Sequence, residues 1–182
     1  MSKNSIGLIE LTSIAAGFQA ADAMLKASDV EIMLSRSICS GKYMVMVRGD
    51  VAAQAAVSSG ISGCRFSVID SFVIPNLHEA VFPAIAGQCK VEEMDALGIV
   101  ESFSVASLIE GADAAVKAAN VQLIEIRLAM ALGGKAFVTM TGNVSAVQAG
   151  VDAAAQMVGQ KGMLVNKVVI PHPRPELLNE MI

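Results

Sequence analysis

Apolar positions along the first half of the chain fall into two patterns, short runs and longer stretches with helical spacing. Residues 13–27 and 51–59 are rich in helix formers, with apolar residues three to four positions apart, and predict helices at Ser13–Ala27 and Val51–Ser59. Asp50 is expected to cap the second helix, and a short final helix is expected at His78–Ile85. The short apolar runs predict strands at Ile6–Leu11, Val30–Ser35, Tyr43–Arg48 and Phe66–Val73.

The second half of the chain repeats the first. Ile6–Glu10 aligns with Leu97–Glu101, and the correspondence continues to Ile74-Pro75 and Ile170-Pro171, with a few residues inserted in the second copy. A duplicated domain follows, with a boundary near Val91 to Ala96, so we predict domains at 1–94 and 95–182. In the second copy, we expect helices at Ser104–Ala119 and Val144–Met157 and strands at Val121–Leu128, Ala136–Thr141 and Met163–Ile170.

The order β-α-β-β-α-β in each copy is that of a ferredoxin-like split βαβ unit, an α/β (α+β) fold.

The composition of the chain excludes some classes of protein and disfavours others. With 54% hydrophobic residues, the chain can bury a core and is not disordered. A net charge of −4 and 4% aromatic residues disfavour nucleic-acid binding. We find no apolar run of membrane-spanning length and no signal-peptide layout, and expect a cytoplasmic protein. With only 16% charged residues, the surface is expected to be partly apolar, which favours an oligomer over a monomer.

Several motifs occur in the same order in both copies. The first carries GLIEL, DAMLKASDV, VRGDV and VIP, and the second carries GIVES, DAAVKAANV, TGNV and VIPHPRP. These motifs resemble the bacterial microcompartment (BMC) shell domain, and two copies in one chain resemble the tandem-domain class of that family. The resemblance implies a homotrimer that forms a pseudo-hexameric tile with an axial pore. It also implies a place in a microcompartment shell beside other shell proteins, and no enzymatic activity.

The resemblance assigns positions to residues of this chain. The loop between the second and third strands of each copy would line the pore. The lysine of the K-A-S/A motif would lie at the tile rim, as Lys26 and Lys117, with Arg174 as a rim partner in the second copy. The first copy has His78 where the second has Arg174, so no rim arginine is expected there. The pore-loop residues would be Ser37, Ile38, Cys39, Ser40 and Gly41, and Met130, Ala131, Leu132, Gly133 and Gly134.

Cys39 is the candidate ligand residue. The three cysteines are Cys39, Cys64 and Cys89, and none forms a C-x-x-C pair. Three-fold symmetry would bring three Cys39 thiolates to one axis, a ligand set that suits an iron–sulfur cluster, Zn or Cu(I). Tandem members of the family from propanediol-utilisation compartments carry a [4Fe–4S] cluster in the pore, so the resemblance implies one cluster shared by three chains through Cys39. Cys64 and Cys89 are interpreted as packing or linker residues.

Three functions stay open at this point. The first is a shell tile whose cluster passes electrons across the shell, with lumen redox enzymes as partners. The second is a purely structural tile with a small-metabolite pore, and the third is a ferredoxin-like ligand-binding protein that does not assemble. Glu10 and Glu101 are interpreted as polar pairs inside the repeated fold, and His78 and His172 as surface residues.

Overall fold

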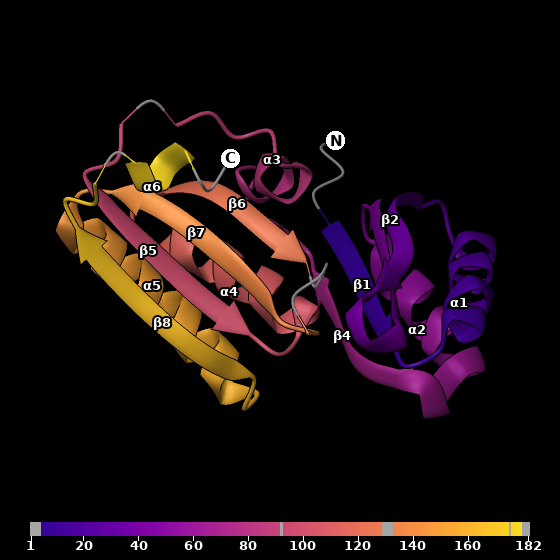
Figure 1. The fold of residues 1–182 in the computed structure, drawn as a ribbon. Coiled ribbons are helices and arrows are strands. Elements are labelled where there is room, and N and C mark those ends of the chain that lie inside the picture. Colours follow the sequence, from indigo (N-terminus) through magenta and orange to yellow (C-terminus); the bar gives the residue numbers. More distant parts are fainter. Residues whose placement is uncertain (1–4, 92, 129–132, 175, 180–182) are drawn as a thin grey trace. The chain divides into compact units, whose positions relative to one another are not determined.

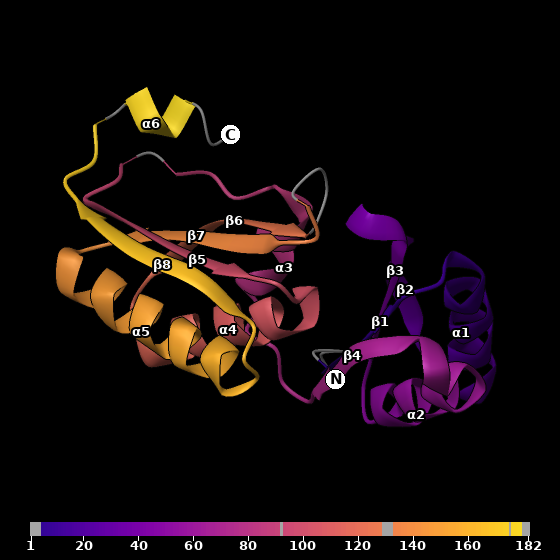
Figure 2. The ribbon, with the colours of Figure 1, turned by 60° about the horizontal axis from the view of Figure 1, so that its bottom comes forward.

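The computed structural model describes residues 5–91, 93–128, 133–174 and 176–179. Its contacts divide the chain into two units. The first comprises the described residues of 1–77 together with Gly133 and Gly134, and the second comprises the described residues of 78–129 and 135–182. Each unit is a four-stranded antiparallel sheet with two long helices (Figures 1 and 2).

The first unit contains a sheet in the order β2-β3-β1-β4. Helices α1 and α2 pack on it around a core of buried aliphatic residues from β1 and β3. This order and these directions are those of the split βαβ unit, which confirms the predicted fold. The elements are β1 (Ser5–Leu11), α1 (Ile14–Ala27), β2 (Glu31–Ile38), a 3₁₀ turn η1 (Cys39–Gly41), β3 (Lys42–Gly49), α2 (Ala52–Cys64), a second turn η2 (Arg65–Ser67) and β4 (Val68–Ile74).

The second unit repeats this arrangement with the sheet order β6-β7-β5-β8. Figure 2 shows α4 and α5 on the same side of this sheet. The short helix α3, which follows the first copy in sequence, packs against β6 and α4 and belongs to this unit. The predicted boundary between residues 94 and 95 stays a prediction. The elements are α3 (Val81–Ala86), β5 (Ala96–Ser102), α4 (Val105–Ala118), β6 (Gln122–Leu128), β7 (Ala136–Gly142), α5 (Val144–Gln160), β8 (Leu164–Pro171) and α6 (Glu176–Asn179).

Local chemistry explains where these helices begin and how closely they pack. Ser13 caps α1, since its Oγ accepts a hydrogen bond from the Ala16 N–H at 3.3 Å. The predicted cap at Asp50 is wrong: α2 begins with Val51 at its N-cap and has no side-chain cap. Gly7 lets α2 approach β1, because a Cβ at this position would collide with Val57 Cγ2. Among the described helices, none is long and apolar enough to cross a membrane.

Candidate functional site

The predicted pore loop of the first copy is a sharp hairpin turn at the end of β2. Ile38 and Lys42 form the last pair of the β2–β3 ladder, so only Cys39, Ser40 and Gly41 make the turn. Ser40 has φ 65° and Gly41 has φ 72°, and both therefore adopt the left-handed conformation. Glycine does this without strain, whereas serine holds it at a cost of about 1 kcal/mol. The left-handed conformation of these two residues fixes the direction of the backbone after Cys39.

In this turn, the small polar residues are exposed to solvent and the one large apolar side chain, that of Ile38, is buried. Ser37, Ser40 and Gly41 are exposed, Cys39 is half-buried, and Ile38 is buried at 6% exposure. Cys39 forms no disulfide. Cys39 lies in a short turn whose two ends are held by β2 and β3. A rigid backbone of this kind is the support that a ligand residue needs.

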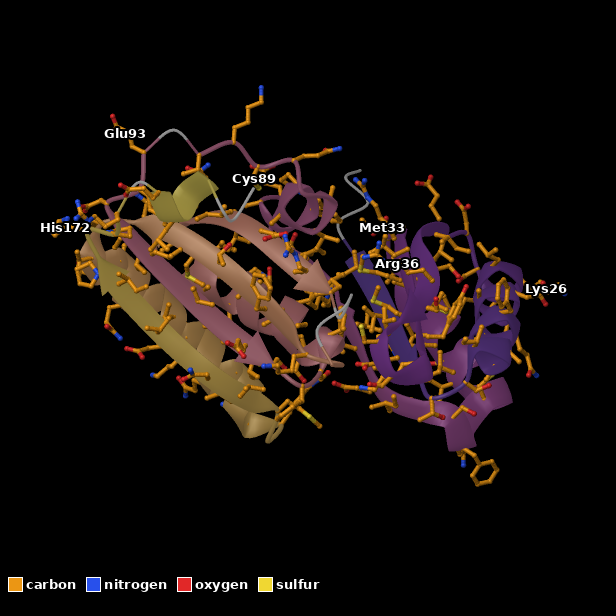
Figure 3. The ribbon with its side chains drawn as sticks, viewed as in Figure 1. Lys26, Met33, Arg36, Cys89, Glu93 and His172 are labelled. Atoms are coloured by element: carbon orange, nitrogen blue, oxygen red, sulfur yellow. The ribbon has the colours of Figure 1, made fainter. Side chains whose placement is uncertain are left out.

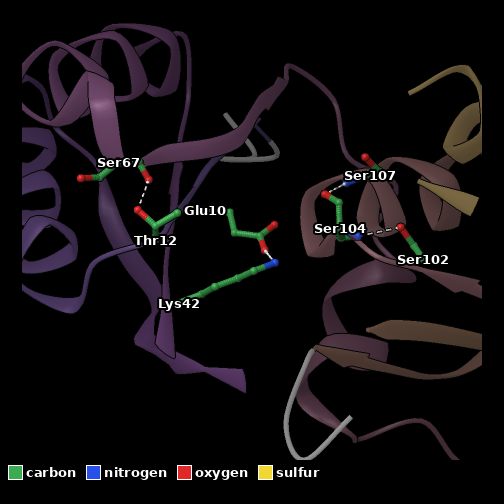
Figure 4. Close-up of polar contacts among 7 residues, drawn as sticks. All are labelled: Glu10, Thr12, Lys42, Ser67, Ser102, Ser104 and Ser107. Carbon is green, nitrogen blue, oxygen red and sulfur yellow. Dashed lines mark hydrogen bonds and ion pairs between the residues drawn. The ribbon is translucent and has the colours of Figure 1, made fainter. Parts of the chain in front are cut away.

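A buried ion pair lies at the base of the same turn. Lys42, the residue after Gly41, donates from Nζ to Glu10 Oε1 at 3.0 Å (Figure 4). The Glu10 side chain is fully buried and that of Lys42 is 21% exposed. Glu10 Oε2 has no hydrogen-bond partner among the described residues. The pair therefore ties β1 to the start of β3, directly beneath the Cys39 turn.

The second copy keeps the ion pair and lacks the cysteine. Lys135 Nζ lies 3.3 Å from Glu101 Oε2, with the side chains 43% and 33% exposed. These pairs confirm that both glutamates serve polar pairing within the repeat. Gly133 and Gly134 precede Lys135 with φ 61° and 87°. The other predicted loop residues, Met130, Ala131 and Leu132, lie outside the described residues.

The other two cysteines lie apart from this turn. Cys64 is buried and its Sγ donates to the Ala16 carbonyl at 3.3 Å, so it packs α2 against α1. Cys89, labelled in Figure 3, is half-buried, and burial raises the pKa of its thiol. Among the described residues, no group of three His, Cys, Asp or Glu side chains could hold a metal ion.

The predicted rim lysines each pair within their own helix. Lys26 Nζ lies 2.6 Å from Asp22 Oδ2, and Figure 3 shows its side chain pointing outward from α1. Lys117 Nζ lies 2.5 Å from Asp113 Oδ2. The sequence signal for both partners was the D-x-x-x-K spacing, which places acid and lysine one helical turn apart. Arg174 is exposed and its carbonyl accepts from the Leu177 N–H at 3.0 Å. Its rim role stays a prediction.

Comparisons with known proteins agree with this duplicated fold. The family model described as "BMC domain" matches the chain twice, at residues 5–77 and 96–173. The chain is 45% identical over 179 residues to the bacterial microcompartment shell protein PduT of Citrobacter freundii, covering 98% of this chain and 97% of that protein. It is 30% identical to the carboxysome assembly protein CcmO of Synechococcus elongatus, covering 97% of this chain and 68% of that protein.

A solved structure extends this agreement to three dimensions. A crystal structure of a microcompartment protein from Desulfitobacterium hafniense superimposes with a TM-score of 0.88 and 47% identity, covering 96% of this chain and 98% of that one. A fused permuted hexameric shell protein, with a TM-score of 0.62 and 20% identity, shares the fold, covering 85% of this chain and 81% of its own. These findings confirm the resemblance and the predicted localisation in a microcompartment shell. With two BMC domains along nearly its whole length, the chain belongs to the BMC-domain family of bacterial microcompartment shell proteins.

Proposed function

We propose that this chain is a tile of a microcompartment shell and that three copies form a pseudo-hexameric ring with Cys39 around its axis. The support for a tile is the pair of BMC domains over nearly the whole chain, together with the identity to a shell protein at 45%. Two domains per chain need three chains to complete six positions. Other shell proteins are the expected neighbours of such a tile.

We further propose that the three Cys39 thiolates hold one [4Fe–4S] cluster. The observation that carries this step is the asymmetry between the copies: the first turn places a half-buried thiol where the second copy has no cysteine. One thiolate per chain gives three soft ligands at a three-fold axis. A cluster bound there would accept and release one electron at a time. The role is therefore structural and electron-carrying, with lumen redox enzymes as partners, and not enzymatic.

The described residues suit that ligand set. Ser40 and Gly41 fix the turn by their left-handed backbone, and the Glu10–Lys42 pair holds the base of the hairpin. Ser37, Ser40 and Gly41 are small and exposed and Ile38 is buried, so these residues of the turn put no bulky exposed side chain beside the thiol. Backbone N–H groups of such a turn are donors of the kind that hydrogen-bond cluster sulfurs and tune the potential.

Anaerobic reconstitution tests the proposal. The protein is incubated with iron and sulfide, desalted, and its iron content, absorption and EPR spectra are measured before and after dithionite. Four irons per three chains and a dithionite-dependent signal support the cluster. Cys39→Ser is expected to abolish both, while the control Cys89→Ser keeps them.

Each other result counts against a defined part of the proposal. A wild-type protein that assembles but takes up no iron favours the purely structural tile. A Cys39→Ser protein that retains the cluster shows that Cys39 is the wrong ligand. Light scattering that finds only monomers contradicts the tile itself and favours a non-assembling ligand-binding protein.

A further inference from the structure

The arginine of β6, Arg127, is balanced by its neighbours in the second unit. Its Nη2 lies 2.6 Å from Glu125 Oε1, and its Nε donates to the same oxygen at 2.8 Å. Its Cζ lies 5.5 Å from the centroid of the Phe137 ring, within the range of a cation–π contact. The strand pairing explains this placement, because Phe137 lies directly opposite Arg127 on β7 and Glu125 lies two residues away on the same strand.

The corresponding arginine of the first unit, Arg36 on β2, lacks both of these partners. The repeat places Leu34 at the position of Glu125. It places Met44, which lies opposite Arg36 on β3, at the position of Phe137. Arg36, labelled in Figure 3, is half-buried, and its Nε is buried with no hydrogen-bond partner among the residues that the structure describes. The first copy therefore keeps the charge of this arginine without the carboxylate that pairs with it in the second.

The other charges on this face of the first sheet do not cancel that of Arg36. Residues paired across strands share a face, so Arg36, Met44, Glu10 and Asp70 form one row across β2, β3, β1 and β4. Glu10 is ion-paired with Lys42, and this pair is neutral as a whole. Asp70 stands three strand spacings from Arg36, which is about 14 Å.

Arg36 lies close to the candidate ligand residue along the same strand. β2 ends at Ile38, and Cys39 begins the turn that follows. A strand rises about 3.3 Å per residue, so the three residues from Arg36 to Cys39 span about 10 Å. In the proposed trimer, three Arg36 side chains would surround the three Cys39 thiolates at this distance. A unit charge about 10 Å away shifts a charge-changing equilibrium about twofold even in water, and three such charges shift it about eightfold.

We infer that Arg36 raises the reduction potential of the proposed cluster at Cys39. On reduction the site gains one electron, supplied by dithionite in the test below, and becomes one unit more negative. A positive charge nearby stabilises the reduced state more than the oxidised one, and net charge is one of the factors that set cluster potentials. Arg36 acts through its charge and is not a ligand. The inference rests on the proposed cluster and adds a residue that tunes it.

Redox titration of the reconstituted protein tests this role. The cluster is formed anaerobically in each variant, and the reduced fraction is followed by EPR in the presence of mediators as dithionite is added. Arg36→Gln is expected to lower the midpoint potential by about 50 mV, which is the eightfold shift converted at about 59 mV per tenfold for one electron. Arg36→Lys keeps the charge and is expected to keep the wild-type midpoint. Leu34→Glu gives Arg36 the carboxylate that Arg127 has, and is expected to lower the midpoint as well.

The second copy supplies the matched control. The double variant Glu125→Gln with Arg127→Gln removes a pair that is already balanced. Since the net charge does not change, its midpoint is expected to equal that of the wild type. Iron content and circular dichroism are measured in parallel, so that a shift in potential is compared only between proteins that carry the cluster and are folded.

The outcomes separate this inference from the proposed function. An unchanged midpoint in Arg36→Gln, with the cluster formed, overturns the inference and leaves the proposed cluster standing. An equal fall in Arg36→Lys also overturns it, because the effect would then follow from side-chain shape and not from charge. If Arg36→Gln does not bind iron, Leu34→Glu decides, since it leaves Arg36 in place, and an unchanged midpoint there overturns the inference. A wild-type protein that takes up no iron refutes the proposed cluster and this inference together.

Discussion

Removal of Lys42 is expected to destabilise the first unit strongly, because its partner carboxylate is buried. Glu10 is 0% exposed and Lys42 Nζ, 3.0 Å away, is its ion-pair partner. Lys42→Met keeps the apolar stem and removes the charge, which leaves the carboxylate without its cation. Breaking a fully buried pair in this way costs about 3–5 kcal/mol. With the Lys42 side chain 21% exposed, water compensates part of the loss, so we expect about 2–4 kcal/mol.

The repeat provides the matched control. In the second copy, Lys135→Met removes the same charge from a pair whose side chains are 43% and 33% exposed. Exposed pairs contribute about 0–1 kcal/mol, so this variant is expected to lose little. The two substitutions are chemically identical, and the two pairs differ mainly in burial: the carboxylate is 0% exposed in the first copy and 33% in the second, and the lysine 21% and 43%.

A spectroscopic probe confined to the first unit reads the difference. The chain has one tyrosine and no tryptophan, and Tyr43 is 4% exposed in the first core. Tyrosine fluorescence during urea denaturation therefore reports the first unit alone. At a slope of about 2 kcal/mol per molar urea, Lys42→Met is expected to lower the Tyr43 midpoint by about 1–2 M. The loss in Lys135→Met, which lies in the second unit, is read from the helix signal in circular dichroism, to which both units contribute, and is expected to shift that transition by about 0.5 M or less.

Two results would refute this reasoning. One is an equal shift of the two midpoints, read from Tyr43 fluorescence for Lys42→Met and from circular dichroism for Lys135→Met, which would mean that burial of Glu10 does not set the cost. The other is a double variant, Glu10→Gln with Lys42→Met, that is no more stable than Lys42→Met alone. Since neutralising both partners removes the buried charge, the double variant is expected to recover at least half of the loss.

Three further predictions concern packing and titration. Gly7→Ala, whose Cβ would collide with α2, is expected to cost about 1–3 kcal/mol in urea denaturation, while Gly159→Ala, with open space around its Cβ, is expected to be neutral or slightly stabilising. The thiol of Cys89, whose pKa is raised by burial, is expected to reach half of its maximal alkylation rate by iodoacetamide at a higher pH than a free cysteine; an ordinary profile would contradict that burial. The hydrogen bond from Lys167, with a second from Gln148, lowers the pKa of Asp152. Its NMR titration midpoint is expected below the usual range and to rise in Lys167→Met; any stability the pair contributes is lost as the pH falls through the lowered pKa.

Much of the fold could be predicted because local patterns were repeated twice. Short apolar runs and helical spacing placed the long elements of the first copy, the repeat extended them to the second, and the β-α-β-β-α-β order was enough to predict their topology. The start of α2 could not be predicted from Asp50. A cap is a hydrogen bond from a side chain to the first helical turn, and α2 has no side-chain cap, so the favourable residue type was present without the contact that a cap requires.

Other features of the site depend on surroundings that no local pattern encodes. The motif D-x-x-x-K predicts an acid–lysine pair in both copies, and the structure contains both. It does not predict that one acid lies under the residues after β4 and the other is exposed, because that depends on which element comes next in the chain. His78, after β4, donates its N–H to Asp113, whose side chain is 10% exposed, whereas the Asp22 side chain is 62% exposed.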